Sequence, residues 1–200
     1  GPGATNLVTG IATAYLDSTP MVAITGNVAC SLIGRDSFQV VDITGITMPV
    51  TMHNFMVKDV TKLAGVLREA FRIARAGRPG PVLVDIPKDV QIAACDYEPA
   101  ASAEAPALKP VDEAVLARAV QLIREAKRPF LYIGGGVQIA GAGNALVKLA
   151  ETIGAPIGTS MMALAAVPHS HPLFLGMTGM HGRYAASIAL DRSDLIIAVG

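Results

Sequence analysis

Short apolar runs recur along the chain, and each is typical of a buried β-strand. One runs from Asp194 to Gly200, and four others begin at prolines, namely Pro20, Pro81, Pro129 and Pro156. Proline is tolerated at the first position of a strand, where its missing N–H costs least. Continuous apolar runs of this length indicate strands that are buried on both faces, as in a parallel sheet.

Apolar residues at helical spacing fill the intervals between these runs. They recur three and four positions apart over residues 63–74, 115–126 and 145–153, which predicts three amphipathic helices. Gly154 and Pro156 stop the last of them. Because strands alternate with helices of this length, the fold class is predicted to be α/β with parallel sheets.

One segment lacks both patterns. Residues 97–110 contain three prolines and many small residues without periodicity, which predicts an extended linker. It separates two α/β pieces, residues 1–96 and 111–200, and both are expected to be incomplete. A glycine-flanked turn such as Gly1–Asn6 is normally preceded by a strand, and none stands before it here. The chain is therefore expected to be an internal fragment of a larger enzyme.

Composition and charge exclude several classes of protein. The chain is 52% hydrophobic, and its 16 basic residues balance its 16 acidic residues, which argues against a nucleic-acid or acidic-membrane partner. No apolar run approaches the roughly 18 residues that span a bilayer. Cys30 and Cys95 are too few and too far apart for a disulfide framework or a CxxC site. A reducing, cytoplasmic compartment is expected, or a plastid or mitochondrion in a eukaryote.

Three segments of the first piece offer groups for ligand binding. In Gly1–Asn6, small residues would let the backbone approach a cofactor closely. The polar loop 25–39 follows a strand, at the end where α/β sheets place their sites. In residues 77–89, Arg78 and Lys88 are cations suited to phosphate or carboxylate. Each also has an ordinary interpretation, as a helix start, a surface loop and solvated loop ends.

The second piece contains a glycine-rich turn, Gly134–Gly136, after a strand. It lacks the G-x-G-x-x-G spacing and the acidic residue further on, so an NAD site is disfavoured, while another flat or phosphorylated cofactor stays open. His169 and His171 have no carboxylate or cysteine at ligand spacing, which argues against a metal site. The usual hydrolase and kinase motifs are absent from the sequence. His181 and Arg183 lie between glycines on a further loop.

In this order, the motifs resemble those of one family. The chain is similar to the catalytic (large) subunit of acetolactate synthase, a thiamine-diphosphate enzyme also called acetohydroxyacid synthase. The resemblance rests on five segments: GPGATN at 1–6, GRDSFQ at 34–39, DITGITMP at 42–49, GRPGPVLVDIPKD at 77–89 and GMHG at 179–182. It covers the whole chain, and five ordered motifs are more specific than any single one.

The resemblance implies a domain assignment and an activity. Residues 1–96 would be the rear part of the pyrimidine-binding domain, and residues 111–200 the front of the central, FAD-carrying domain. Members of the family decarboxylate pyruvate and condense the product with a second 2-ketoacid, pyruvate or 2-ketobutyrate. This is the first common step of branched-chain amino-acid biosynthesis. The resemblance further implies a homodimer or tetramer with active sites at the subunit interface, and a regulatory small subunit.

Site residues follow from the same resemblance. Pro2 and Asn6 would line the aminopyrimidine end of thiamine diphosphate, Phe38 and Gln39 would face the reacting carbon, and Lys88 would lie on the substrate channel. A structural FAD would be contacted by eight residues: Arg78, Gly134, Gly135, Gly136, Ser160, Met161, Met180 and His181. The Mg²⁺ ligands and the activating glutamate would lie outside this chain, so the 200 residues alone are expected to form no acetolactate.

The sequence departs from the family pattern at several positions, which are Ala29, Val40, Met52, Ala163 and Ala165. The first lines the channel where herbicides bind in the family, and the second removes a carboxylate from the loop after Gln39. Other thiamine-diphosphate enzymes remain alternatives: pyruvate oxidase, glyoxylate carboligase or sulfoacetaldehyde acetyltransferase. A non-catalytic α/β module that binds flavin or nucleotide is an alternative from a different class.

Overall fold

The computed structural model describes residues 1–99 and 110–200. The chain divides into two compact units, Gly1–Ala107 and Leu108–Gly200, and each is an α/β unit with its own parallel sheet. The predicted fold class is confirmed. The division falls within the predicted linker 97–110, of which residues 100–109 lie outside the described part, and the domain boundaries stay a prediction.

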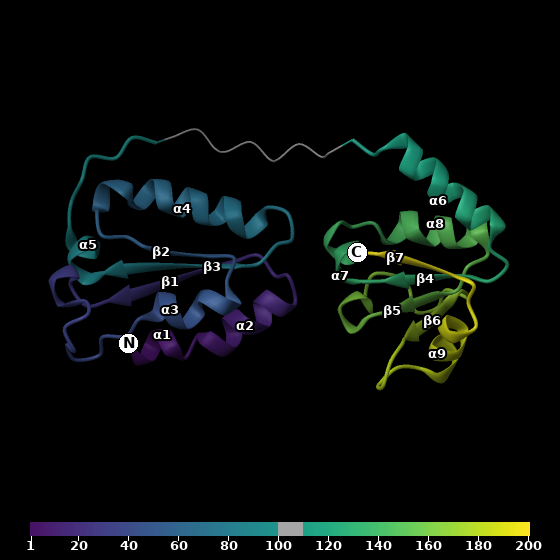
Figure 1. Ribbon diagram of the computed structural model, residues 1–200, viewed down its shortest axis with the longest axis horizontal. Coiled ribbons are helices and arrows are strands. Elements are labelled where there is room, and N and C mark those ends of the chain that lie inside the picture. The colour runs from purple at the N-terminus through teal and green to yellow at the C-terminus, as the bar shows by residue number, and fades with distance from the viewer. Residues whose placement is uncertain (100–109) are drawn as a thin grey trace. The chain divides into compact units, whose positions relative to one another are not determined.

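Unit 1 is built on a three-stranded parallel sheet in the order β1-β3-β2. Helix α4 covers one face of the sheet, and α1, α2 and α3 lie on the other (Figure 1). The strands are β1 (Met21–Asn27), β2 (His53–Met56) and β3 (Pro81–Pro87). The helices are α1 (Pro2–Thr5), α2 (Val8–Leu16), α3 (Ile43–Thr47), α4 (Val60–Arg75) and α5 (Lys88–Ile92), with 3₁₀ turns at Cys30–Leu32 and Met48–Val50.

The central strand β3 explains the core of unit 1. All of its residues are buried, including Asp85. Val82 and Val84 pack with Ala70 and Ala74 of α4, while Leu83, on the opposite face, packs on the side of α2 and α3. This alternation follows from the two-residue period of a strand. A strand covered on both faces needs the continuous apolar run that the sequence provides.

Unit 2 is built on a four-stranded parallel sheet in the order β6-β5-β4-β7. Helix α8 lies on one face and α9 on the other (Figure 1). The strands are β4 (Pro129–Ile133), β5 (Ile157–Thr159), β6 (Phe174–Met177) and β7 (Leu195–Val199). The helices are α6 (Glu113–Glu125), α7 (Gly135–Ile139), α8 (Gly143–Ile153) and α9 (Tyr184–Asp191), with a 3₁₀ turn at Met161–Ala163.

The strand order of unit 2 creates a topological switch point. From β4 the chain moves outward to β5 and β6, and then returns to place β7 on the other side of β4. The direction in which the chain moves across the sheet therefore reverses between β4 and β7. Open α/β sheets bind ligands at such a point, outside the carboxyl ends of the strands.

The five predicted strands and three predicted helices are confirmed, with ends shifted by a few residues. Strands β2 and β6 were not predicted, because each is only four residues long and carries no continuous aliphatic run. Gly1–Asn6 was expected to be a turn, but Pro2–Thr5 is helical, since proline at the first position is already shaped for a helix. No helix in the described part of the chain is both long and apolar enough to cross a membrane.

Candidate active site

The carboxyl ends of β1, β2 and β3 meet at one end of the sheet of unit 1, called here the carboxyl end. The chain terminus at Gly1 lies at this end, together with α5 (Figure 1). A Cβ atom built on Gly1 would lie only 2.2 Å from the carbonyl oxygen of Gln39. The backbones of these residues are thus in direct contact, and the structure brings the first motif against the loop that carries Phe38 and Gln39.

This loop is held in an unusual backbone conformation. Asp36 and Gln39 have φ angles of 51° and 63°, a left-handed region that residues other than glycine seldom adopt. The Val40 N–H donates to the Ser37 carbonyl oxygen at 3.0 Å and closes a turn around the pair Phe38–Gln39. Phe38 is 84% exposed. Strained backbone of this kind clusters at ligand sites, which is consistent with the role predicted for Gln39.

Lys88 also lies at the carboxyl end of unit 1. It is exposed and is the first residue of α5, directly after β3. Pro2 and Asn6, the predicted cofactor contacts, are exposed at the start and end of α1. Of the site residues predicted in unit 1, only Arg78 is elsewhere, because it precedes the amino end of β3. Its guanidinium donates to Ser18 Oγ at 2.7 Å and to the Leu16 carbonyl oxygen at 3.2 Å.

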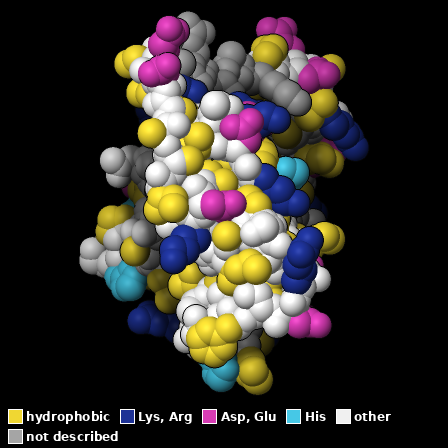
Figure 2. Space-filling model, turned by 90° about the vertical axis from the view of Figure 1, so that its left-hand side faces the viewer, with side chains coloured by type: hydrophobic (Ala, Val, Ile, Leu, Met, Phe, Trp, Pro, Cys, Tyr) yellow, Lys and Arg dark blue, Asp and Glu magenta, His cyan; other side chains and the backbone are white. Residues whose placement is uncertain are grey.

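The surface at the carboxyl end of unit 1 is mixed in chemistry. Figure 2 looks onto this end and shows hydrophobic side chains spread between single Lys, Arg, Asp and Glu side chains. Leu32, Phe38 and Ile92 are among the exposed hydrophobic residues there. Because no single charge sign dominates the face, recognition of an anionic ligand would depend on individual cations such as Lys88.

Two carboxylates that the sequence analysis missed hold the loop 28–39 at its beginning. Asp85 is fully buried, and it accepts hydrogen bonds from Thr25 and Asn27. Asp89, in the first turn of α5, accepts from the Cys30 N–H, with both oxygens 3.1 Å from the nitrogen. For Asp85 a signal was present in the sequence, because an aspartate within an apolar strand is buried and must be paired.

The Asp89 hydrogen bonds predict a dependence of stability on pH. The Cys30 N–H holds the pKa of the Asp89 carboxyl below its ordinary value. The bond therefore adds stability above the ordinary carboxyl pKa of about 4, and this contribution is lost as the pH falls through the lowered pKa. We expect Asp89→Asn to lower the melting temperature at pH 7, and the difference from wild type to shrink below about pH 4.

Thermal melts of the two proteins across this pH range measure the effect. Asp96→Asn is the matched control, because Asp96 is an exposed aspartate beyond the end of α5. A difference between Asp89→Asn and wild type that stays constant from neutral to strongly acid pH would contradict the prediction.

In unit 2, the seven predicted flavin contacts gather at the carboxyl end of the sheet. They follow three neighbouring strands: Gly134, Gly135 and Gly136 after β4, Ser160 and Met161 after β5, and Met180 and His181 after β6. Met161 is 63% exposed and Met180 is 91% exposed. The structure thus presents backbone N–H groups, a hydroxyl, an imidazole and apolar side chains at one end of this unit.

The glycines after β4 pack against the end of β7. The Gly134 N–H donates to the Val199 carbonyl oxygen at 2.8 Å. A Cβ on Gly134 would lie 2.1 Å from the Gly200 carbonyl oxygen, and one on Gly136 would lie 2.7 Å from the Gly200 Cα. Close approach of the two backbones therefore requires glycine at both positions. These glycines lie at the switch point between β4 and β7.

Thr159 is a further polar residue at this end that sequence reasoning missed. It is fully buried at the end of β5, beside the predicted contact Ser160. Among the described residues, its Oγ1 has no hydrogen-bond partner, although a buried hydroxyl without one is costly. The orphaned hydroxyl is consistent with a polar ligand group at this end of unit 2.

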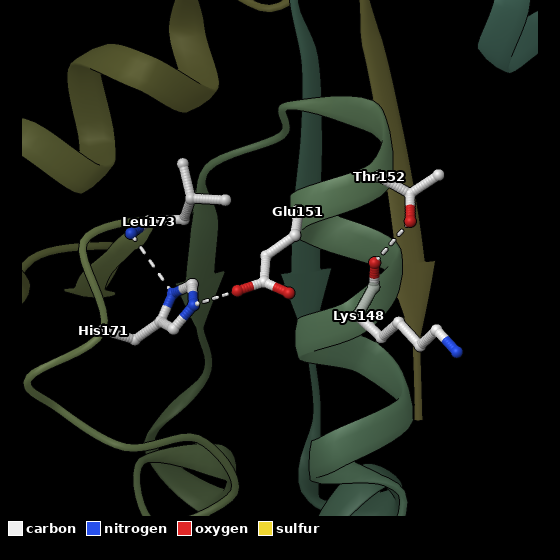
Figure 3. Close-up of polar contacts among 5 residues, drawn as sticks. All are labelled: Lys148, Glu151, Thr152, His171 and Leu173. Atoms are coloured by element: carbon white, nitrogen blue, oxygen red, sulfur yellow. Dashed lines mark hydrogen bonds and ion pairs between the residues drawn. The ribbon is translucent and has the colours of Figure 1, made fainter.

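The two neighbouring histidines serve the protein's own structure. His171 Nδ1 accepts from the Leu173 N–H, and Nε2 lies 3.3 Å from Glu151 Oε1 on α8 (Figure 3). Nε2 must therefore carry the proton that faces the carboxylate. His169 Nε2 lies 2.7 Å from the Leu164 carbonyl oxygen, and its ring stacks on Phe174. Nowhere in residues 1–99 and 110–200 do three metal-binding side chains form a cluster.

The two parallel sheets, each with candidate ligand groups at its carboxyl end, define the class as an α/β protein with the ligand-site layout of open parallel sheets. Family models identify it further. The model of the thiamine pyrophosphate enzyme N-terminal TPP binding domain matches residues 1–46, and that of the thiamine pyrophosphate enzyme central domain matches residues 116–200. The chain belongs to the thiamine pyrophosphate (thiamine diphosphate) enzyme family.

Individual relatives make the similarity more specific. Over its whole length the chain is 55% identical to the acetolactate synthase large subunit of Corynebacterium glutamicum and 49% identical to the isozyme 1 large subunit of Escherichia coli. It is 48% identical to a probable acetolactate synthase large subunit of Methanocaldococcus jannaschii. The chain spans 32% of the first relative and 35% of each of the other two. The family resemblance of the sequence motifs is confirmed.

Proposed function

We propose that the complete protein is an acetolactate synthase, which decarboxylates pyruvate and joins the product to a second 2-ketoacid. The observation that carries this proposal is the identity of 48–55% to large subunits from bacteria and an archaeon, with 100% of the chain aligned. The products would be 2-acetolactate from pyruvate and 2-aceto-2-hydroxybutyrate from 2-ketobutyrate.

The carboxyl end of unit 1 fits thiamine diphosphate. Exposed polar and apolar groups converge there, and the Gly1 backbone is pressed against the loop of Gln39. Pro2 and Asn6 would hold the aminopyrimidine end. When bound, the cofactor supplies a thiazolium carbon that acts as an electron sink for decarboxylation.

The chain's own side chains would bind and orient the substrates. The Gln39 amide can donate a hydrogen bond to the oxygen of a 2-ketoacid, and the Lys88 ammonium attracts its carboxylate. The exposed Phe38 ring would cover the reacting groups and exclude water from them. We assign Gln39, Phe38 and Lys88 to the catalytic site on this basis.

The carboxyl end of unit 2 fits FAD. The switch point, the backbone N–H groups of Gly135 and Gly136 and the orphaned Thr159 hydroxyl suit a flat ligand with phosphate and ribityl oxygens. Ser160, Met161, Met180 and His181 would complete the contacts, and the flavin would be structural. Arg78 belongs to unit 1, and its contact with the flavin is proposed on the family resemblance alone. No residue of this chain is proposed as a Mg²⁺ ligand.

The names of the relatives support a partner subunit. All three reported relatives are named as large subunits, so we propose a regulatory small subunit as partner. We further propose a homodimer or tetramer with active sites at the subunit interface. Acetolactate formation with and without a co-expressed small subunit tests the first of these proposals.

A direct assay tests the activity itself. The complete protein, supplied with thiamine diphosphate, Mg²⁺, FAD and pyruvate alone, should form acetolactate, which acid converts to acetoin for colorimetric detection. Gln39→Ala should lose this carboligation while the protein stays folded. Absence of acetoin from the wild-type reaction would favour another thiamine-diphosphate enzyme, and an unchanged rate in Gln39→Ala would remove Gln39 from the catalytic site.

A further inference from the structure

The buried carboxylate of Asp85 joins the central strand of unit 1 to its neighbour. Asp85 is 0% exposed at the end of β3. It accepts a hydrogen bond from Thr25 Oγ1 at 2.8 Å and another from Asn27 Nδ2 at 2.6 Å, both from β1. A buried carboxylate is strongly destabilising unless such donors pair with it. The two strand ends are therefore locked together by charge-assisted bonds.

The same carboxylate decides which way the Asn27 amide faces. A carboxylate can only accept hydrogen bonds, so Asn27 must turn its NH₂ group toward Asp85. Its Oδ1 is then left on the other side, where it accepts from the Val28 N–H at 2.9 Å. Two residues later, the Cys30 N–H donates to Asp89. The first turn of the loop after β1 is thus fixed by groups from the β3–α5 junction.

Lys88 belongs to that same junction, between the two aspartates in the sequence. The loop 28–39, which follows Asn27, carries Phe38 and Gln39, the other candidate catalytic residues. We infer that Asp85 is a positioning residue, which acts through the Asn27 amide to hold the start of the loop 28–39 in register with Lys88. Its consequence for catalysis rests on the proposed function, whereas its consequence for the loop does not.

Exchanging the residue types at positions 27 and 85 tests the inference. In Asn27→Asp, two carboxylates face each other in place of the amide–carboxylate bond. At a pH high enough to ionise both, neither can donate, and the loop start is released. Asp85→Asn is the milder change, because its amide can flip and let Thr25 act as the acceptor. In the double variant Asn27→Asp/Asp85→Asn, the new amide at position 85 donates to the new carboxylate at position 27. The other oxygen of that carboxylate still accepts from the Val28 N–H, so every bond is restored with unchanged net charge.

Hydrogen exchange and steady-state kinetics of the complete protein measure the effect of these variants. Hydrogen exchange of the Val28 and Cys30 amides should accelerate in Asn27→Asp and return toward wild type in the double variant. The kcat/KM for pyruvate should fall about 10- to 100-fold in Asn27→Asp, since a small misplacement of reacting groups costs this much, and recover in the double variant. Thiamine-diphosphate affinity should change less than kcat/KM, because Pro2 and Asn6 are not on this loop.

A control separates positioning from stability alone. Thr51→Val removes another buried hydrogen bond of unit 1, from Thr51 Oγ1 to the Thr47 carbonyl oxygen, and should lower the melting temperature without lowering kcat/KM. All rates are taken well below the melting temperature of each variant, so that the folded fraction is equal.

The outcomes distinguish the two proposals. Accelerated exchange in Asn27→Asp that the double variant reverses supports the inference about the loop, even if the wild-type protein forms no acetolactate and the proposed function fails. Unchanged exchange in Asn27→Asp, or a double variant no better than Asn27→Asp, would overturn it. If wild type is active and Asn27→Asp keeps its full kcat/KM, the catalytic part of the inference is wrong.

Discussion

Replacement of Gly1 by alanine in the complete protein should lower acetolactate formation about a hundredfold. The new Cβ would lie 2.2 Å from the Gln39 carbonyl oxygen and 3.0 Å from its carbonyl carbon. Backbone atoms cannot rotate away as the end of a flexible side chain can, so the loop of Gln39 must move. A displaced Gln39 no longer meets the reacting groups, and steady-state kinetics with pyruvate measure the loss.

Gly3 provides the matched control for this prediction. It lies in α1 two residues further on, and a Cβ built there meets nothing within 4 Å. Gly3→Ala should therefore leave the loop of Gln39 in place and lose less activity than Gly1→Ala. Helical propensity also favours alanine at this position. Equal activity of Gly1→Ala and Gly3→Ala would show that contact between Gly1 and Gln39 does not matter for the reaction.

Replacement of Gly134 by alanine should weaken flavin binding by the complete protein and destabilise it. The new Cβ would lie 2.1 Å from the Gly200 carbonyl oxygen, and overpacking of this kind costs about 1–3 kcal/mol. Relief of the clash separates the turn after β4 from the end of β7 and opens the switch point. We expect flavin affinity to fall about tenfold or more, since about 1.4 kcal/mol corresponds to that factor.

Gly135→Ala, at the neighbouring position, is the matched control for Gly134→Ala. A Cβ at this position would lie 3.1 Å from the Cβ of Met162, a tight contact that a shift of a few tenths of an ångström relieves. Absorbance of bound flavin and thermal melts should therefore place Gly135→Ala between Gly134→Ala and wild type. Full flavin content in Gly134→Ala would contradict the proposed cofactor site at the carboxyl end of unit 2.

Much of the fold could be predicted from local pattern. β3 is apolar along its length because both of its faces are covered, and α8 ends where Gly154 adopts a left-handed conformation with φ of 64°. The apolar stripe of α6 predicted its helix correctly, but none of its residues is buried. A periodic pattern determines local structure, whereas burial depends on which elements lie nearby.

The candidate site could be predicted only in part. The motifs supplied Gln39, Lys88 and the glycines, and the family resemblance supplied their expected roles. Neither the motifs nor the resemblance revealed that Gly1 contacts Gln39. The two residues are far apart in sequence, and their contact exists only after the strands pair. Asp85 was visible as a carboxylate in an apolar strand, but its partners Thr25 and Asn27 come from another strand.

By itself the sequence determined the alternation of strands and helices, the family, and the chemical groups available for binding, because these depend on residue types and local spacing. Only the tertiary structure decided which groups meet. Parallel pairing brought Lys88 and the loop of Gln39 to the carboxyl end of unit 1 and left Arg78 near the opposite end. It also gave the order β6-β5-β4-β7 in unit 2. These arrangements depend on hydrogen bonds between distant segments, which no local pattern encodes.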